Sequence, residues 1–265
     1  MARASTPPSG ACAHFVLWRL RAGGGACHTG AMHGLTIVFD LDGTLVDTAP
    51  DLVRATNHVL DLLGAEPLPP ATLRPWISHG ARRMIVEAAA LRSMALDEAA
   101  TERSLDRFLE HYLANIAHES RPFPGVEDVL DALAAEGAAL AVCTNKREAW
   151  SRLLLDLLGM TPRFRAIAGR DTFAVCKPDP GHLTGVIAAA GGDPARAIMV
   201  GDSGVDVATA RAAAVPVIGV TFGYSDTPLA ALGPDAVIGH YRELRPAIRA
   251  LAGRTGLAHT VPEQP

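Results

Sequence analysis

The sequence predicts an α/β protein: a doubly wound, mainly parallel sheet with an inserted domain made only of helices. Short apolar runs rich in Val and Ile alternate with segments of helical periodicity over most of the chain, which is typical of a layered α/β domain. Between the first apolar strand and residue 120 only helical patterns occur, which indicates an insertion. Polar residues follow three of the strands directly, as expected where strands end at a ligand-binding edge.

The chain divides into four parts. Residues 1–33 contain no acidic residue and are rich in Ala, Gly, Ser and Pro, so we expect a disordered or non-native extension. A targeting segment and a true start at Met32 are the alternatives. We expect the α/β core over residues 34–47 and 121–253, a helical cap over 48–120, and a flexible tail over 254–265.

The first strand is the run Ile37–Phe39, which ends at Asp40. The cap begins with a helix near Thr48, where Pro50 suits the first turn, and this helix ends at Gly64. Further cap helices are expected from Met84 to Leu91 and from Asp97 to about Ile116.

Beyond Pro122-Phe123-Pro124-Gly125 the alternation of strands and helices returns. The apolar spacing predicts helices over 126–137, 147–158, 179–190, 207–213 and 241–251. It predicts strands over 138–143, 165–168, 197–200, 217–221 and 236–238.

The composition of the chain excludes several classes of function. A net charge of −4 argues against a nucleic-acid footprint, and no run approaches the roughly 18 apolar residues that a membrane span needs. The four cysteines, at positions 12, 27, 143 and 176, lack the spacing of a zinc site or a disulfide framework. We therefore expect a cytoplasmic protein, monomeric or homodimeric, whose partners are small molecules and neither nucleic acid nor membrane.

Two carboxylates close the first strand. Asp40 and Asp42 are two residues apart, so they would share a face if the strand continued, and Gly43 allows a sharp turn after them. Carboxylates this close repel each other unless a cation lies between them, and Mg²⁺ is the usual one. The alternative is an ordinary acidic turn after a strand.

Other polar residues follow later strands. Thr144 and Asn145 come after the strand ending at Cys143, Asp202 follows the strand ending at Val200-Gly201, and Lys177 lies in a loop stiffened by two prolines. In a parallel sheet the strand ends lie at one edge, so these groups should converge with Asp40. Taken one at a time, each of these residues also has an ordinary structural explanation, as a helix cap or as a solvated lysine.

The order of these motifs resembles the haloacid dehalogenase superfamily: Asp-x-Asp-Gly-Thr, then Thr-Asn after a strand, then Lys-Pro, then Gly-Asp-Ser-x-x-Asp. The helical insertion resembles the type 1 cap of that superfamily. The strings Asp40–Asp51 and Val220–Tyr224 are similar to those of bacterial phosphoglycolate phosphatases. The resemblance covers about residues 34–251. It implies a Mg²⁺-dependent phosphomonoester hydrolase that forms an aspartyl-phosphate and converts 2-phosphoglycolate to glycolate and phosphate.

The resemblance also implies a role for each residue. Asp40 would be the nucleophile and Asp42 the general acid and base. Thr144, Asn145 and Lys177 would bind the phosphoryl group. The Mg²⁺ ligands would be the carboxylates of Asp40 and Asp202 with the backbone carbonyl of Asp42. In support, Asp206 would steady Lys177 or a metal-bound water, and Thr44 would position Asp42.

The cap should select the substrate. The segment 76–83 occupies the place of the specificity loop of the type 1 cap, and a substrate carboxylate would favour a basic partner there. His79, Arg82 and Arg74 are the candidates, although a solvated helix face explains them equally well. Phosphoglycolate phosphatases often carry Gly-x-Gly in this loop, whereas this chain has Ser78-His79-Gly80.

Other functions fit parts of the pattern. A phosphatase or mutase acting on a sugar phosphate or another small ester would share the same core, and a catalytically inactive binding protein would keep the scaffold. A haloalkanoate dehalogenase needs no second aspartate, so Asp42 argues against it. A phosphonate hydrolase uses a cap lysine, and no lysine occurs between Gly34 and Arg121.

Overall fold

The computed structural model describes residues 32–254, and its centre is a parallel sheet. The strand order is β5-β4-β1-β6-β7-β8, and every neighbouring pair is parallel. The strands are β1 Thr36–Phe39, β4 Ala139–Cys143, β5 Ala166–Ala168, β6 Ala197–Gly201, β7 Val217–Val220 and β8 Ala236–Ile238. β1 lies between β4 and β6, so the residues that follow these three strands meet at one edge.

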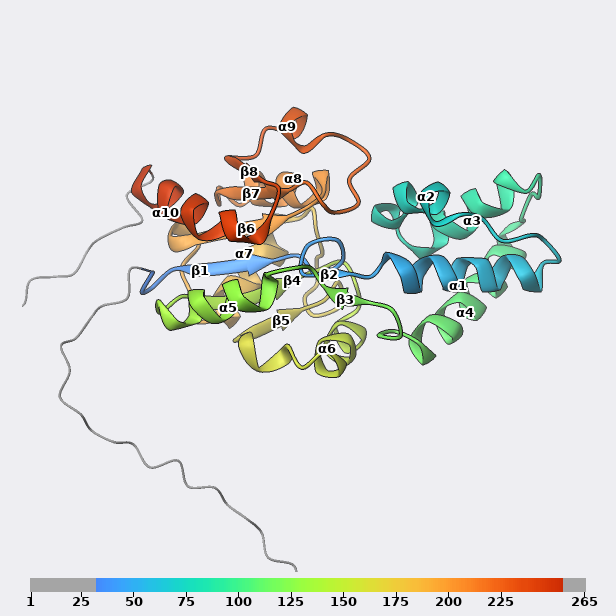
Figure 1. Cartoon of the computed structure of the whole chain (residues 1–265), viewed down its shortest axis with the longest axis horizontal. Helices are drawn as coiled ribbons and strands as arrows, with labels where there is room; N and C mark the ends of the chain where they lie inside the picture. The colour runs from blue at the N-terminus through green and yellow to red at the C-terminus, as the bar shows by residue number, and fades with distance from the viewer. Residues whose placement is uncertain (1–31, 255–265) are drawn as a thin grey trace, which may run out of the picture.

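Helices cover both faces of the sheet (Figure 1). Alternate residues of β1 serve the two layers: Ile37 and Phe39 pack in the cluster that includes α5 and α10, and Val38 packs with α7 and α8. The core helices are α5 Val126–Ala135, α6 Glu148–Leu157, α7 Pro180–Ala189, α8 Gly204–Ala212, α9 Leu229–Leu232 and α10 Leu244–Arg254. The 3-10 turns of the core are η2 Thr161–Arg163, η3 Pro194–Arg196 and η4 Tyr241–Glu243.

The cap lies beyond the carboxyl edge of the sheet (Figure 1). It consists of α1 Ala49–Leu62, α2 Pro70–Leu73, the 3-10 turn η1 Arg74–His79, α3 Ala81–Leu91 and α4 Glu98–Ala114. α1 packs against both α3 and α4, and buried side chains such as Leu60 and Met84 fill the space between the helices. Figure 1 shows the cap joined to the core by two chain crossings.

The two crossings form a short antiparallel ribbon. β2 (Val46–Asp47) pairs with β3 (Arg121–Pro122), with Val46 opposite Pro122. Asp51, at the start of α1, fastens the same place, since its carboxylate accepts the N–H groups of Glu119 and Ser120 and the Ser120 hydroxyl. The entry to the cap and the exit from it are therefore hydrogen-bonded to each other.

The predicted fold class is confirmed, with differences at the ends of elements. The β2–β3 ribbon was not predicted, because two-residue strands carry no periodicity. α8 begins at Gly204 and not at Val207, because Ser203 and Asp206 cap it reciprocally. The last helix, expected from Tyr241, starts as the 3-10 turn η4.

The predicted extension and tail fall largely outside the described residues, which exclude 1–31 and 255–265. Met32 lies within the range predicted as an extension, yet its side chain is buried among core residues, so the packed chain begins before residue 34. None of the helices between residues 32 and 254 has the length and apolar character required to cross a membrane.

Candidate active site

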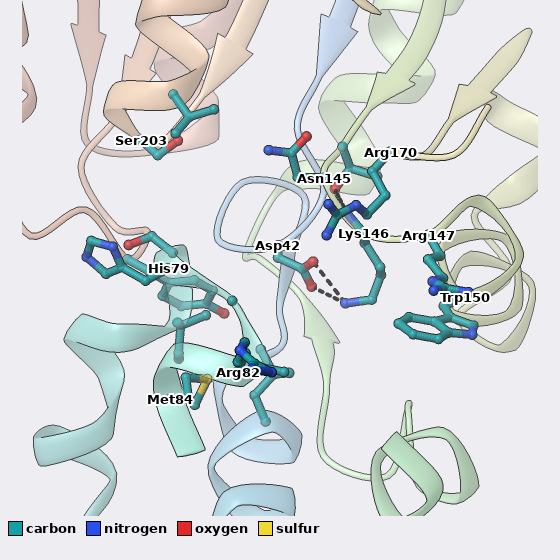
Figure 2. A pocket seen from close by; sticks show the side chains of 18 of the residues that line it. Asp42, His79, Arg82, Met84, Asn145, Lys146, Arg147, Trp150, Arg170 and Ser203 are labelled. Atoms are coloured by element: carbon teal, nitrogen blue, oxygen red, sulfur yellow. Dashed lines mark hydrogen bonds and ion pairs between the residues drawn. The ribbon is translucent and has the colours of Figure 1, made fainter. Parts of the chain in front are cut away.

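A cavity of about 450 Å³ lies between the carboxyl edge of the sheet and the cap. Its core wall includes Asp40, Asp42, Thr144, Asn145, Lys177 and Asp202, which the sequence places at the strand ends. Its cap wall includes residues of η1, α3 and α4. Figure 2 shows His79 and Arg82 on the cap side and Asn145 and Lys146 on the core side.

Asp40 is the first group at this edge. It follows β1, is 8% exposed, and has its Oδ1 atom 2.9 Å from Lys177 Nζ. The same Oδ1 accepts no hydrogen bond from the described part of the chain. Burial raises the pKa of Asp40 to about 6, although Lys177 opposes this. The one group that the described residues bring within ion-pair distance of this buried oxygen is the Lys177 ammonium.

Lys177 lies between two carboxylates. Its ammonium is 2.7 Å from Asp206 Oδ1 as well as 2.9 Å from Asp40. Burial alone would lower the pKa of Lys177, but Asp206 and Asp40 outweigh burial and raise it. Of the two roles expected for Asp206, the contact with Lys177 is the one present.

A buried histidine fixes the backbone of Lys177. The Lys177 N–H donates to Nδ1 of His182 at 3.1 Å, and Nε2 of His182 lies 3.1 Å from the Gly169 carbonyl. Because a carbonyl only accepts, the proton of this ring lies on Nε2. Burial, together with the nearby ammonium of Lys177, lowers the pKa of His182 to about 4.

Asp202 follows β6 and faces Asp40. It accepts the Tyr224 N–H at 2.7 Å and the Thr44 hydroxyl at 3.1 Å. Burial raises its pKa to about 8, with the charges of Asp206 and Asp40 adding to the effect. Thr44 was predicted to position Asp42; that prediction is wrong, because its hydroxyl donates to Asp202.

Asp42 turns toward a different group. Its Oδ1 accepts the Thr48 hydroxyl at 2.7 Å, and both its oxygens accept from Lys146 Nζ, at 2.7 and 2.9 Å (Figure 2). Burial alone would lower the pKa of Lys146, but Asp42 and Tyr112 raise it. Asp42 is therefore ion-paired at the cavity wall.

Thr144 and Asn145 lie where β4 ends. Thr144 is 2% exposed, and its hydroxyl accepts the Lys146 N–H at 3.2 Å. The Asn145 side chain donates to the Lys177 carbonyl at 3.0 Å, which links the loop after β4 to the loop of Lys177. The structure thus brings these two residues together with Lys177, as expected from a parallel sheet.

The acidic groups fit a hard cation. Carboxylate oxygens of Asp40, Asp202 and Asp206 lie within 4.8 Å of one another. Asp40 carries a buried oxygen without a hydrogen bond, and oxygen ligands are those that a hard divalent cation prefers. Asp206 is already occupied by Lys177 and Ser203, and the Asp42 side chain lies outside this cluster.

The three cap candidates differ in position. His79 and Arg82 line the cavity, whereas Arg74 is absent from its lining and donates to the Phe222 carbonyl. His79 Nε2 lies 3.2 Å from an Asp226 carboxylate oxygen. Arg82 pairs with Glu98 and Glu102 of α4.

Sequence reasoning missed several lining residues, namely Tyr112, Lys146, Arg147, Trp150 and Arg170. One signal was available for Lys146: it is one of only two lysines in the chain, and it directly follows Thr144-Asn145 at the end of a predicted strand. Tyr112 carried no signal, because its helical spacing is that of a core residue.

Comparison with known proteins supports one family. Residues 37–220 match the model of the haloacid dehalogenase-like hydrolases. The phosphoglycolate phosphatase of Agrobacterium fabrum is 51% identical over 211 residues, which cover 80% of this chain and 91% of that protein. The phosphoglycolate phosphatase of Caulobacter vibrioides is 44% identical over 85% of this chain and 98% of its own.

A solved structure gives the same result for the fold. The crystal structure of a predicted phosphoglycolate phosphatase from Haemophilus somnus superposes with a TM-score of 0.75 and 30% identity, covering 81% of this chain and 97% of that one. The matched range contains all four polar motifs of the cavity wall. The chain belongs to the haloacid dehalogenase-like hydrolases.

Proposed function

We propose that this protein is a Mg²⁺-dependent phosphomonoester hydrolase that converts 2-phosphoglycolate to glycolate and phosphate. The observation that carries the proposal is the buried Asp40 carboxylate, which faces the cavity between Lys177 and a second acidic group, Asp202. The names of the relatives from Agrobacterium fabrum and Caulobacter vibrioides support the substrate.

Asp40 is the nucleophile in the proposed reaction. Its carboxylate oxygen attacks phosphorus, a phosphorus–oxygen bond forms, and the bond to the ester oxygen breaks, which leaves an aspartyl-phosphate. Asp42 gives a proton to the leaving glycolate oxygen. It then takes a proton from the water that attacks the aspartyl-phosphate, which releases phosphate and restores Asp40.

Three groups balance the charge of the phosphoryl oxygens. Lys177 supplies a fixed positive charge, and its contact with Asp206 holds the ammonium in place. Thr144 offers a hydroxyl and Asn145 a backbone N–H at the same wall. His182 and the Asn145 side chain fix the backbone that carries Lys177.

The carboxylates of Asp40 and Asp202, with the backbone carbonyl of Asp42, would hold Mg²⁺. When bound, the cation lowers the repulsion between the anionic nucleophile and the anionic phosphate. The raised pKa values of Asp40 and Asp202 agree with a site that lacks positive charge without its cation. We also propose a cytoplasmic enzyme, because the cysteines lack the spacing of a disulfide framework, and a monomer or homodimer.

Phosphate release tests this function. The wild-type protein should release phosphate from 2-phosphoglycolate with Mg²⁺ and lose this activity in EDTA. Asp40→Asn should abolish turnover, whereas Asp156→Asn, at an exposed carboxylate of α6, should not. Turnover that survives EDTA or Asp40→Asn contradicts the mechanism. Faster hydrolysis of a sugar phosphate or pyrophosphate in a panel of small esters contradicts the substrate.

A further inference from the structure

Lys146 has no task in the reaction described so far. It is one of only two lysines in the chain, and its side chain is 6% exposed. It follows Thr144-Asn145 directly and lines the same cavity. A buried ammonium at the wall of a binding cavity needs an anion to balance it.

Asp42 supplies that anion here. Both oxygens of Asp42 accept from Lys146 Nζ (Figure 2). The Tyr112 ring of α4 lies 5.0 Å from the same nitrogen. Lys146 therefore contacts a core carboxylate and a cap aromatic ring at once. A ligand between core and cap would lie directly against it.

The pair with Asp42 conflicts with the proposed task of Asp42. To give its proton to the ester oxygen, Asp42 must turn toward the phosphate that Asp40 attacks, and it cannot then keep both oxygens on Lys146. Lys146 would be left as a buried cation without a partner, which is unfavourable unless another anion takes the place of Asp42. The ligand itself has to bring that anion.

The proposed substrate carries one. In 2-phosphoglycolate an ester oxygen and a methylene are all that separate phosphorus from the carboxyl carbon, so the carboxylate lies beside the reacting centre. We propose that Lys146 recognises this carboxylate by exchanging its ion pair with Asp42 for one with the bound substrate, an inference that rests on the proposed function. No covalent bond changes in the exchange.

The other cations of the cavity are less suited to this task. Arg82 is paired with Glu98 and Glu102, and His79 lies beside Asp226. Arg147 stacks over Trp150 and is exposed, and Arg170 is exposed as well. Lys146 differs from them because its side chain is shielded from water and because its partner, Asp42, has to turn away during the proposed reaction.

The exchange makes selectivity depend on the substrate. A phosphate ester without a nearby carboxylate leaves Asp42 on Lys146, where it cannot reach the ester oxygen. An ester with the carboxylate releases Asp42. The same contact thus provides binding and frees the acid, so discrimination should appear in kcat as well as in KM.

Two phosphonates measure the contact without turnover. 3-Phosphonopropionate replaces the ester oxygen of 2-phosphoglycolate by a methylene, and propylphosphonate lacks its carboxylate. Their dissociation constants for the wild-type protein and for each variant are measured by isothermal titration calorimetry in the presence of Mg²⁺. The wild-type protein should bind 3-phosphonopropionate about 10- to 100-fold more tightly than propylphosphonate, as expected for a shielded charged hydrogen bond.

Lys146→Met should bring that ratio close to one, and Lys146→Arg should restore part of it. Arg170→Met is the matched control, because Arg170 lines the same cavity but is exposed; its ratio should stay near that of the wild type. Circular dichroism and the melting temperature establish that each variant folds, and Lys146→Gln, which also removes the charge, takes the place of an unfolded Lys146→Met.

An unchanged ratio in Lys146→Met, or a collapse in Arg170→Met alone, overturns the inference. Neither result contradicts the proposed function. The proposed function is contradicted by a different measurement, namely faster hydrolysis of another ester than of 2-phosphoglycolate by the wild-type protein. A wild-type ratio near one also overturns the inference, since no group then recognises the carboxylate.

Discussion

The stability of the protein should depend on pH through His182. This ring is fully buried, accepts the Lys177 N–H and donates to the Gly169 carbonyl. Its pKa is about 4 in the folded protein, below an ordinary value of about 6.5, because burial and Lys177 disfavour the imidazolium. Protonation of this ring therefore favours the unfolded chain.

The direction and size follow from linkage. A lowered folded pKa contributes stability above pH 6.5, and the contribution is lost as pH falls toward 4. The full difference amounts to about 3 kcal/mol, of which about 2 kcal/mol is lost between pH 7 and pH 5. His182→Leu cannot take up this proton, so the wild type should lose about 2 kcal/mol relative to His182→Leu between pH 7 and pH 5.

Urea unfolding, followed by circular dichroism at pH 7 and pH 5, measures the difference. At pH 7 His182→Leu should be less stable than the wild type by about 2 to 4 kcal/mol, because two buried backbone groups lose their partner. His33→Gln, which removes an exposed histidine, should follow the wild-type pH dependence. If the difference in free energy of unfolding between the wild type and His182→Leu is the same at pH 7 and at pH 5, the reasoning is refuted.

Three further outcomes are expected. Gly43→Ala should lower kcat/KM about 100-fold, because the new Cβ would lie 2.5 Å from Asp202 Oδ2. Gly64→Ala, at a similar positive φ but with open space around it, should keep full activity. Equal effects of the two substitutions on kcat/KM would contradict the role of Gly43. Tyr224→Phe should lower the free energy of unfolding in urea by about 2 kcal/mol, since its hydroxyl accepts two buried N–H groups where α1 begins; an unchanged midpoint argues against that role. Without a metal, the melting temperature should fall from pH 5 to pH 8, because the raised pKa values of Asp40 and Asp202 make the folded state hold more protons than the unfolded chain. Mg²⁺ at about 100 times its Kd should raise the melting temperature by about 5 to 10 °C at pH 8 and by less at pH 5. An increase that is the same at both pH values would speak against Asp40 and Asp202 as ligands.

The sequence predicts the core of this site better than its cap wall, for a physical reason. Asp40, Thr144 and Asp202 each follow an apolar strand, and a parallel sheet brings such positions to one edge whatever the loops do. That inference needs only the strand ends. It therefore survives errors of one or two residues in the predicted elements.

The hydrogen-bond and ion-pair partners of a side chain cannot be predicted from the positions of strand ends. Thr44 is two residues from Asp42, yet it donates to Asp202, which is 158 positions away in sequence. Arg82 is a plausible anion ligand by type, but α4 brings Glu98 and Glu102 against it. These choices depend on how helices pack, and periodicity does not determine packing angles or contacts across a cavity.

The β2–β3 ribbon makes the cap an exchangeable module. Because Val46 and Pro122 face each other, the whole helical segment enters and leaves the core at one narrow point. A replacement segment of different length then closes onto the same two ends, and the entropy of closure changes only slowly with length. The chemistry at the sheet edge and the wall that faces the substrate can therefore diverge separately, so one core could accept a series of substrates by replacement of the cap alone.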